Sequence, residues 1–367
     1  MKPAGTRTTR LPSSTCQPLT RRAILHGGAA ACALQASASL RSAAAAPPAD
    51  YVQFGQTDLM VTRYCQGTAF RKVPRSDNTA ARRILFRCLD VGINFFDSAE
   101  AYGWGGSETV LGKVIRGRRE KLVICTKAAP SLAPVKDPDT NKFRLGKKLD
   151  FTRQNLTEKL NGSLKRLGTD YVDLFLLHSP DEGQTPPEQL AQWMESLVKS
   201  GKTRYWGISN YPAPQVAEFH QLGIKGQATS PIAGTEDYFN IASRDRFEPE
   251  MPPVMRRTKL GLLAFSPQDM GRLAPERAID PIERPLVRVL DEVARELGAT
   301  RPQITIAWVL SRSEVTSALG GAETPEQAAE NFAGSRLRLP GDLKKRLDAA
   351  SEALLAAKRK RKRKSTS

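Results

Sequence analysis

Short apolar runs alternate with amphipathic segments from about residue 60 to residue 350. Several of the runs are almost continuously apolar, which is typical of parallel strands covered on both faces. The pattern predicts strands at Val61–Gly67, Ile93–Phe96, Leu122–Thr126, Val172–Leu177, Thr203–Ile208, Gly226–Ile232, Leu260–Phe265 and Val315–Leu319.

The segments between the runs carry helix start and stop signals. Segments 185–188 (TPPE) and 324–327 (TPEQ) each begin with a threonine suited to an N-cap, followed by proline and an acidic or amide side chain. Leucine stripes that end at Gly168, Gly201 and Gly298 predict helices that stop at a left-handed glycine.

Eight strand–helix alternations without an internal linker predict an α/β fold, a single (β/α)8 TIM barrel. The alternative is an open doubly wound sheet. Against that alternative, the chain has neither a G-x-G-x-x-G turn between a strand and a helix nor a Walker-type phosphate loop. We assign residues 50–350 to the barrel, 1–49 to a cleavable leader, and 351–367 to the end of the last helix and a basic tail.

Positive charge is concentrated at the two ends of the chain. The formal net charge is +18, but residues 1–49 hold six basic and no acidic side chains, and the run 358–364 (KRKRKRK) holds seven more. Residues 50–357 therefore carry only +5, which does not indicate a nucleic-acid-binding fold. We expect the terminal run to be solvated, with contact to an anionic membrane or nucleic acid as the alternative.

The leader combines Arg21 and Arg22 with a weakly apolar run to Leu40 and a small-residue zone at 42–46. These features look like a twin-arginine export signal, which would place the protein in the periplasm or cell envelope. A mitochondrial or plastid transit peptide, or a disordered tail on a cytoplasmic protein, is the alternative. The run is too short and polar for a membrane-spanning helix, so no integral membrane segment is expected.

Metal and disulfide chemistry have little support. The chain has three histidines, one of them in the leader, which argues against a His-rich metal site. Cys65, Cys88 and Cys125 stand in apolar segments without a C-x-x-C pair, so we expect buried thiols and no metal.

Ionisable residues follow three of the predicted strands. Asp97, Lys127 and His178 each come directly after an apolar run, and the carboxyl ends of barrel strands meet at one mouth where active sites lie. Tyr102 follows Asp97 by five residues. An ammonium near this phenol would lower its pKa, and a carboxylate would orient the ammonium. The set predicts proton transfer to a developing alkoxide, with His178 as a hydrogen-bond donor to a carbonyl oxygen.

With these residues the sequence resembles the aldo-keto reductase family over nearly the whole body. The matching segments are Gly67-Thr68, 97–103 (DSAEAYG), Thr126-Lys127, 163–168 (SLKRLG), Leu177-His178, 207–210 (GISN), 265–267 (FSP) and 324–327 with Glu330-Asn331. The resemblance implies an NAD(P)H-dependent carbonyl reductase or alcohol dehydrogenase. It implies Tyr102 as general acid, Lys127 and Asp97 as the groups that tune it, and His178 as the group that orients a small-molecule carbonyl substrate.

The resemblance also implies a dinucleotide site. Ser209 and Asn210 would bind the carboxamide, Phe265 would stack on the nicotinamide, Ser266 and the turn at Gly271-Arg272 would follow the pyrophosphate, and Glu330-Asn331 would lie at the adenine. The full set of expected cofactor residues is Gly67, Thr68, Ser209, Asn210, Gln227, Phe265, Ser266, Gly271, Arg272, Gln327, Glu330 and Asn331.

Three features depart from the family pattern. The carboxamide-binding Gln of the sixth strand is assigned to Gln227, with Glu236 as a second register. The segment Gln268–Arg284 after the seventh strand is short, so a reduced lid is expected. The stretch after the eighth strand offers Glu323 and Gln327 where a cation often holds a 2′-phosphate. NADP(H) is slightly favoured, and NAD(H) is the alternative.

A second function remains open at this stage. Some barrels of the family act as cofactor-bound sensors or channel-associated subunits, and a complete Asp-Tyr-Lys-His set does not exclude that role. A nucleic-acid partner is not expected, because only the tail at 358–364 would support one.

Overall fold

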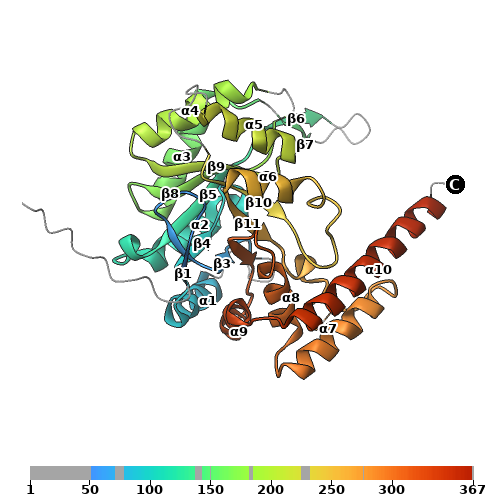
Figure 1. Ribbon diagram of the computed structural model, residues 1–367. Helices are drawn as coiled ribbons and strands as arrows, with labels where there is room; N and C mark the ends of the chain where they lie inside the picture. The colour runs from blue at the N-terminus through green and yellow to red at the C-terminus, as the bar shows by residue number, and fades with distance from the viewer. Residues whose placement is uncertain are drawn as a thin grey trace, which may run out of the picture. The chain divides into compact units, whose positions relative to one another are not determined.

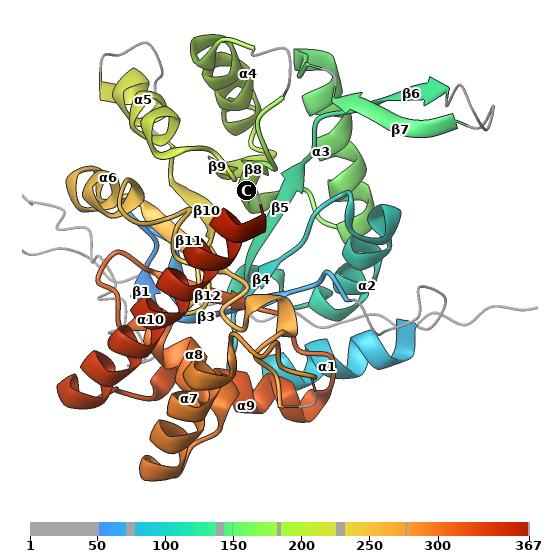
Figure 2. The ribbon, with the colours of Figure 1, turned by 90° about the vertical axis from the view of Figure 1, so that its right-hand side faces the viewer.

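The computed structural model describes residues 51–70, 78–136, 143–148, 150–181, 185–224, 232–275 and 277–365 (Figure 1). The leader assigned to residues 1–49 lies outside these ranges. The described chain folds around one closed barrel, and helices surround the barrel in Figure 2.

The barrel consists of eight parallel strands. In chain order they are β3 (Tyr64–Gly67), β4 (Phe95–Asp97), β5 (Val123–Ala128), β8 (Val172–Leu177), β9 (Thr203–Ser209), β10 (Gly234–Tyr238), β11 (Gly261–Phe265) and β12 (Ser317–Gly320). Each strand pairs with the next one, and β12 closes the ring on β3, where Leu319 lies opposite Cys65. The expected (β/α)8 TIM barrel is confirmed.

Helices follow the strands around the outside. They are α1 (Asn78–Val91), α2 (Gly106–Ile115), α3 (Arg153–Leu167), α4 (Pro187–Lys199), α5 (Ala213–Ile224), α6 (Met251–Thr258), α7 (Arg284–Glu296), α8 (Arg301–Leu310), α9 (Pro325–Arg336) and α10 (Gly341–Ser365). A hairpin of β6 (Leu132–Lys136) and β7 (Phe143–Lys148) projects between β5 and α3 (Figure 2). The leucine stripes predicted from the sequence face the barrel, and Gly168, Gly201 and Gly298 have the positive φ expected after α3, α4 and α7.

The amino end of the barrel is closed by a hairpin of β1 (Tyr51–Gln53) and β2 (Met60–Thr62). The Phe54 ring at this hairpin packs against Gly234 and Gly261. A Cβ on Gly261 would lie 2.5 Å from the Phe54 ring, and a Cβ on Gly234 would lie 2.3 Å from the Gly261 carbonyl oxygen. Both positions therefore require glycine, and Phe54 forms the floor of the barrel.

Two apolar clusters stabilise the fold. The outer cluster joins the strands to the helices and includes Trp206 and Trp308. The inner cluster fills the barrel above Phe54 with Phe95, Leu174 and Leu263 among others. Layers of side chains inside such a barrel form a packed core, so the space for a ligand lies at the mouth.

Two expectations about local structure are wrong. The sixth strand is Gly234–Tyr238, later than the expected 226–232, because its sequence is polar although the strand is buried, so it has no apolar run. The helix predicted at Thr185 begins at Pro187, with Pro186 as N-cap. The Thr185 hydroxyl instead donates a 2.6 Å hydrogen bond to Asp181.

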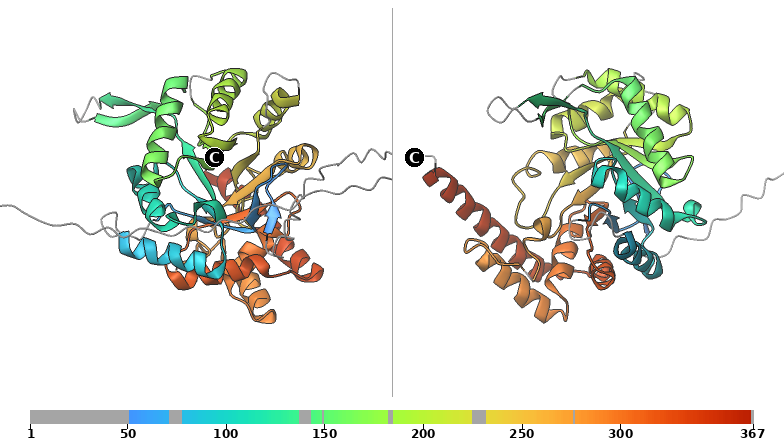
Figure 3. Two further views of the ribbon diagram at one scale, coloured as in Figure 1. Left: turned by 90° about the vertical axis from the view of Figure 1, so that its left-hand side faces the viewer. Right: turned by 180° about the vertical axis from the view of Figure 1, so that it is seen from behind.

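The basic run continues helix α10 as far as Ser365 (Figure 3). The first turn of this basic run contacts the segment before α7, because Lys358 lies 3.2 Å from Glu283 and Arg361 lies 3.0 Å from Asp280. Within the described residues, no helix is both long and apolar enough to cross a membrane.

Candidate active site

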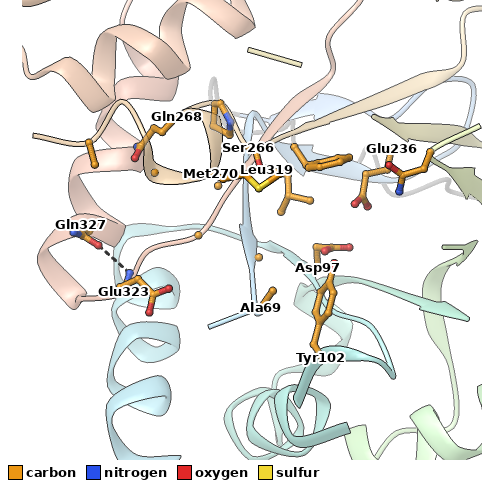
Figure 4. Close-up of a pocket in the computed structure, with 18 of the residues that line it drawn as sticks. Ala69, Asp97, Tyr102, Glu236, Ser266, Gln268, Met270, Leu319, Glu323 and Gln327 are labelled. Carbon is orange, nitrogen blue, oxygen red and sulfur yellow. Dashed lines mark hydrogen bonds between the residues drawn. The ribbon is translucent and has the colours of Figure 1, made fainter. Parts of the chain in front are cut away.

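A cavity of about 650 Å3 opens at the carboxyl ends of the barrel strands (Figure 4). Asp97 and Tyr102 lie at one end of it, and Glu323 and Gln327 lie at the other. Its volume is in the range of small-molecule and cofactor sites. The lining residues are Gly67, Ala69, Asp97, Tyr102, His178, Asn210, Glu236, Phe265, Ser266, Pro267, Gln268, Met270, Gly271, Ala274, Arg277, Leu319, Gly320, Gly321, Glu323 and Gln327.

We call the end of the cavity at Asp97 and Tyr102 the inner end, and the end at Glu323 and Gln327 the outer end. Lys127 lies at the centre of the cluster of ionisable residues at the inner end. Its side chain is fully buried, and Nζ donates to Asp97 Oδ1 at 2.5 Å and to the Ser98 carbonyl at 3.1 Å. The Tyr102 hydroxyl lies 3.5 Å from the same nitrogen. Burial lowers the pKa of Lys127, but Asp97 and Glu236 raise it by more, so the ammonium remains charged. Lys127 therefore contacts both Asp97 and Tyr102, the two residues predicted to act with it.

Tyr102 begins a short 3-10 helix, η1 (Tyr102–Gly105), in which Gly103 and Trp104 have positive φ. This tight turn places the phenol beside His178, with the two rings edge to face and their centroids 5.6 Å apart. Burial is the largest influence on the pKa of Tyr102 and raises it, while Lys127 lowers it as expected. The net result is a raised pKa, so the phenol is protonated at neutral pH.

The strands that carry the site are fixed by a second layer of polar contacts. Thr126 Oγ1 donates to Glu108 at 2.6 Å, and Arg166 Nε binds the other oxygen of that carboxylate at 2.6 Å. The Arg166 side chain crosses Gly105, where a Cβ would lie 2.5 Å from Arg166 Cδ. The segment 163–168 thus supports the turn that holds Tyr102.

Glu236 of β10 extends into the cavity beside Asp97 (Figure 4). Its side chain is buried, and Oε2 lies 3.3 Å from Lys127 Nζ, outside hydrogen-bond geometry. Burial, followed by the nearby Asp97, raises the pKa of Glu236 to about 8. The second register considered for the sixth strand is therefore the one at the mouth, whereas Gln227 lies outside the described residues.

The expected cofactor residues separate into two groups. Gly67, Asn210, Phe265, Ser266, Gly271 and Gln327 line the cavity. Thr68, Ser209, Arg272, Glu330 and Asn331 are not among the lining residues. Asn331, for example, is buried, donates to the Tyr64 hydroxyl at 3.1 Å and accepts from Gln268 at 3.0 Å.

Arg272 differs most from its expected role at the pyrophosphate. Its guanidinium binds Asp269 at 2.5 Å and lies 3.5 Å from Glu283. It therefore holds the turn after β11 closed on itself and does not line the cavity. Asp269 also accepts a hydrogen bond from Tyr238.

Arg277 is a cavity residue that the sequence reasoning missed. It lies in the segment after the seventh strand and lines the same cavity as Glu323 and Gln327. Arg277 and Glu323 are 46 positions apart in the chain, so the sequence does not show that they line one cavity. The one available signal was that the segment Gln268–Arg284, which contains Arg277, departs from the family pattern in length. Gln268, Ala274 and Leu319 also line the cavity without having been predicted as site residues, because neither amide nor aliphatic side chains at these positions carry a recognisable motif.

The buried residues Asp97, Cys125 and Glu236 place possible metal ligands within 4.8 Å of one another. Lys127 Nζ lies at 2.5 Å and 3.3 Å from the two carboxylates, so an ammonium already holds the position of a cation. Cys65, Cys88 and Cys125 are buried free thiols, as expected.

Several known proteins are similar in sequence to this chain. The chain is 33% identical over 276 residues to a putative voltage-gated potassium channel subunit beta of Schizosaccharomyces pombe, which covers 68% of this chain and 77% of that protein. It is 31% identical over 325 residues to the uncharacterized oxidoreductase YrpG of Bacillus subtilis, which covers 82% of this chain and 95% of that protein.

Known structures share the fold. The thermostable aldo-keto reductase Tm1743, solved with the inhibitor epalrestat, superposes with a TM-score of 0.68 at 28% identity, over 82% of this chain and 99% of that one. AKR11C1 from Bacillus halodurans has a TM-score of 0.67 at 23% identity, over 83% and 97% of the two chains, and supports the fold alone.

The family assignment rests on the body of the chain. Residues 65–352 match the model of the Aldo/keto reductase family, and this range includes all eight barrel strands except Tyr64 of β3. Members of this family are oxidoreductases that use nicotinamide cofactors, which the family match and the fold support for this protein. The chain therefore belongs to the aldo/keto reductase family.

Proposed function

We propose that this protein reduces an aldehyde or ketone with a nicotinamide dinucleotide, or oxidises the corresponding alcohol, with Tyr102 as the general acid or base. One observation carries the proposal. A fully buried Lys127 joins Asp97 and Tyr102 at the inner end of an open cavity. Burying three ionisable groups together costs folding free energy, and such clusters are typical of catalytic sites.

Each of these residues has a chemical task in the reduction. When bound, the dinucleotide supplies the hydride. Tyr102 donates its hydroxyl proton to the carbonyl oxygen as negative charge develops there. Lys127 stabilises the phenolate that remains, at 3.5 Å from the phenolic oxygen. Asp97 keeps the ammonium charged and oriented, and His178 borders the substrate space beside the Tyr102 ring.

The cavity fits a dinucleotide in several respects. Phe265 offers an aromatic wall and Asn210 a carboxamide next to the catalytic end. Gly271 and Gly321 line the outer part, and a Cβ at either position would meet no atom within 4 Å, so the backbone borders open space there. The nicotinamide would be held near Phe265 and Asn210, and the adenine half near Gln327.

The choice between NADP(H) and NAD(H) depends on the outer end of the cavity. Glu323 would repel a 2′-phosphate, whereas Arg277 would attract one. The two charges oppose each other in the same cavity. We propose NADP(H), by a small margin, as the preferred cofactor.

A second candidate function is that of a cofactor-bound sensor or channel-associated subunit. Its support is the 33% identity to a protein described as a putative potassium channel beta subunit. A barrel in that role would still bind the dinucleotide, so binding alone does not separate the two functions.

The experiment that separates them is cofactor turnover. Purified protein is first tested for NADPH and NADH binding by fluorescence, and then for oxidation of the bound cofactor by a panel of aldehydes and ketones. We expect saturable turnover of at least one carbonyl class. Tight dinucleotide binding without turnover of any compound would refute the reductase proposal and favour the sensor. Failure to bind either dinucleotide would refute both.

A further inference from the structure

The inner end of the cavity contains more acids than bases. Asp97 Oδ1 and Glu236 Oε2 both contact Lys127 Nζ, at 2.5 Å and 3.3 Å. All three side chains are buried. A buried carboxylate is stable as an anion only when a cation or several hydrogen bonds compensate it. Lys127 compensates one carboxylate, so the pair lacks one positive charge.

The groups around Glu236 do not supply the missing charge. In the part of the chain that the structure describes, the titratable groups near Glu236 are Cys65, Asp97, Tyr102, Cys125, Lys127, His178 and Asp237. Arg277 and Glu323 line the same cavity, but neither is among the groups that shift the pKa of Glu236 most. Lys127 is the residue among these that favours the Glu236 anion, whereas Asp97 and Asp237 oppose it. Asp237 is adjacent in β10 but is not a lining residue, and Arg246 lies near it.

Two species can supply the charge that the pair lacks. One is a proton on Glu236, which makes the group neutral. The other is a cation that enters the cavity, where Glu236 is a lining residue together with Phe265 and Asn210. The oxidised nicotinamide ring is a cation and the reduced ring is neutral, so the two redox forms of one dinucleotide differ in the charge they would bring to this place.

We propose that Glu236 determines which redox form of the dinucleotide binds more tightly, because its ionised carboxylate attracts the cationic ring of the oxidised form and not the neutral ring of the reduced form. The inference rests on the proposed function only in that a nicotinamide dinucleotide enters this cavity. Where Glu236 starts protonated, binding of the oxidised form moves its proton to the solvent. The cost of that step weakens the preference at low pH. The pKa of Glu236, raised by burial to about 8, places the change within an accessible range.

The first test compares equilibrium binding of NAD+ and NADH to the wild-type protein and to Glu236→Gln, which keeps the shape and removes the charge. At about pH 9.5, we expect the ratio of Kd for NADH to Kd for NAD+ to be roughly tenfold or more larger in the wild type than in the variant. At about pH 6 the two ratios should converge. The matched control is Asp237→Asn, which removes the charge of the neighbouring buried acid, a residue that does not line the cavity. Because Asp237 also raises the pKa of Glu236, the control is compared at about pH 9.5, where Glu236 remains ionised and the binding ratio should stay that of the wild type.

Proton release gives an independent readout. Calorimetry near neutral pH, in two buffers of different ionisation enthalpy, measures the protons released on binding. The wild type should release up to about one proton more with NAD+ than with NADH, and Glu236→Gln should lose that difference.

The outcomes separate the inference from the proposed function. Equal binding ratios in the wild type and Glu236→Gln at both pH values, with no difference in proton release, would overturn the inference and leave the proposed function intact. A wild-type protein that binds neither NAD(H) nor NADP(H) would refute the proposed function and the inference with it, and a wild type that binds only NADP(H) is tested in the same way with NADP+ and NADPH. Should Glu236→Gln fail to fold by circular dichroism, the wild-type pH series decides, and a constant binding ratio across it would overturn the inference.

Discussion

Replacing Tyr102 by Phe removes one oxygen atom from the centre of the proposed mechanism. The ring itself keeps its edge-to-face contact with His178 at 5.6 Å. The lost contact to Lys127 is long, at 3.5 Å, so the folding free energy should change by less than about 1 kcal/mol. The variant therefore tests the chemistry of the hydroxyl with little disturbance of the fold.

The expected loss of activity is large by comparison. General acid catalysis contributes roughly 10²–10⁴-fold, or about 2.7–5.5 kcal/mol of transition-state stabilisation. Burial keeps the Tyr102 phenol protonated, so the wild type has its proton available for reduction across neutral pH. We expect kcat/KM for carbonyl reduction to fall by that factor, while the Kd of the dinucleotide changes less than about threefold.

The assay is steady-state and single-turnover reduction with the best carbonyl from the panel, together with fluorescence titration of the cofactor. Tyr211→Phe is the matched control, because Tyr211 is also buried but does not line the cavity. Reduction by Tyr102→Phe within about threefold of the wild type would refute the assignment of Tyr102 as proton donor.

Three further predictions concern the outer cavity, the leader and pH. Glu323→Arg should tighten NADPH binding by roughly 10- to 100-fold, and an unchanged NADPH-to-NADH ratio of Kd values would show that the 2′-phosphate does not lie there. We also propose export by the twin-arginine route. Arg21→Lys with Arg22→Lys should abolish it in a bacterial fractionation, and equal export of both forms would contradict that route. Burial raises the pKa of Glu236 from 4.5 to about 8, so ionisation of Glu236 opposes folding. The stability that the neutral carboxyl provides at low pH is lost as pH rises through about 8. The urea midpoint should therefore fall from about pH 5 to pH 9, and fall less in Glu236→Gln; identical slopes would contradict this account.

Much of the fold could be predicted because the barrel strands are buried on both faces. The apolar runs gave β8 with its observed bounds at Val172–Leu177, and most other strands to within a few residues. The sixth strand escaped this reasoning because it reads Gly-Thr-Glu-Asp-Tyr, with two acids among five residues. Those acids are buried beside Lys127 and Arg246, a tertiary environment that no local pattern contains.

The catalytic end of the site could be predicted for a similar reason. Strand ends converge by the geometry of the barrel, so Asp97, Lys127 and His178 could be placed together from sequence. The outer end depends on how the loop after β11 folds, and here the prediction was less successful. Arg272 bonds to Asp269 and Glu283, and the cation that borders the cavity is Arg277. The choice between two arginines five positions apart depends on loop contacts that the sequence does not display.

The closed floor of the barrel limits how a proton can reach Tyr102 during a catalytic cycle. Phe54 and the apolar layer above it fill the barrel below Lys127, whose side chain is fully buried. Among the described residues, the route from bulk water to Tyr102 is therefore the cavity that substrate and dinucleotide would themselves fill. A Tyr102 that has given up its proton would regain one only after a ligand leaves. Each turnover would then use a single proton that Tyr102 already holds when the ligands bind. A solvent isotope effect should therefore appear in the chemical step, and no separate slow proton uptake should be seen within one turnover.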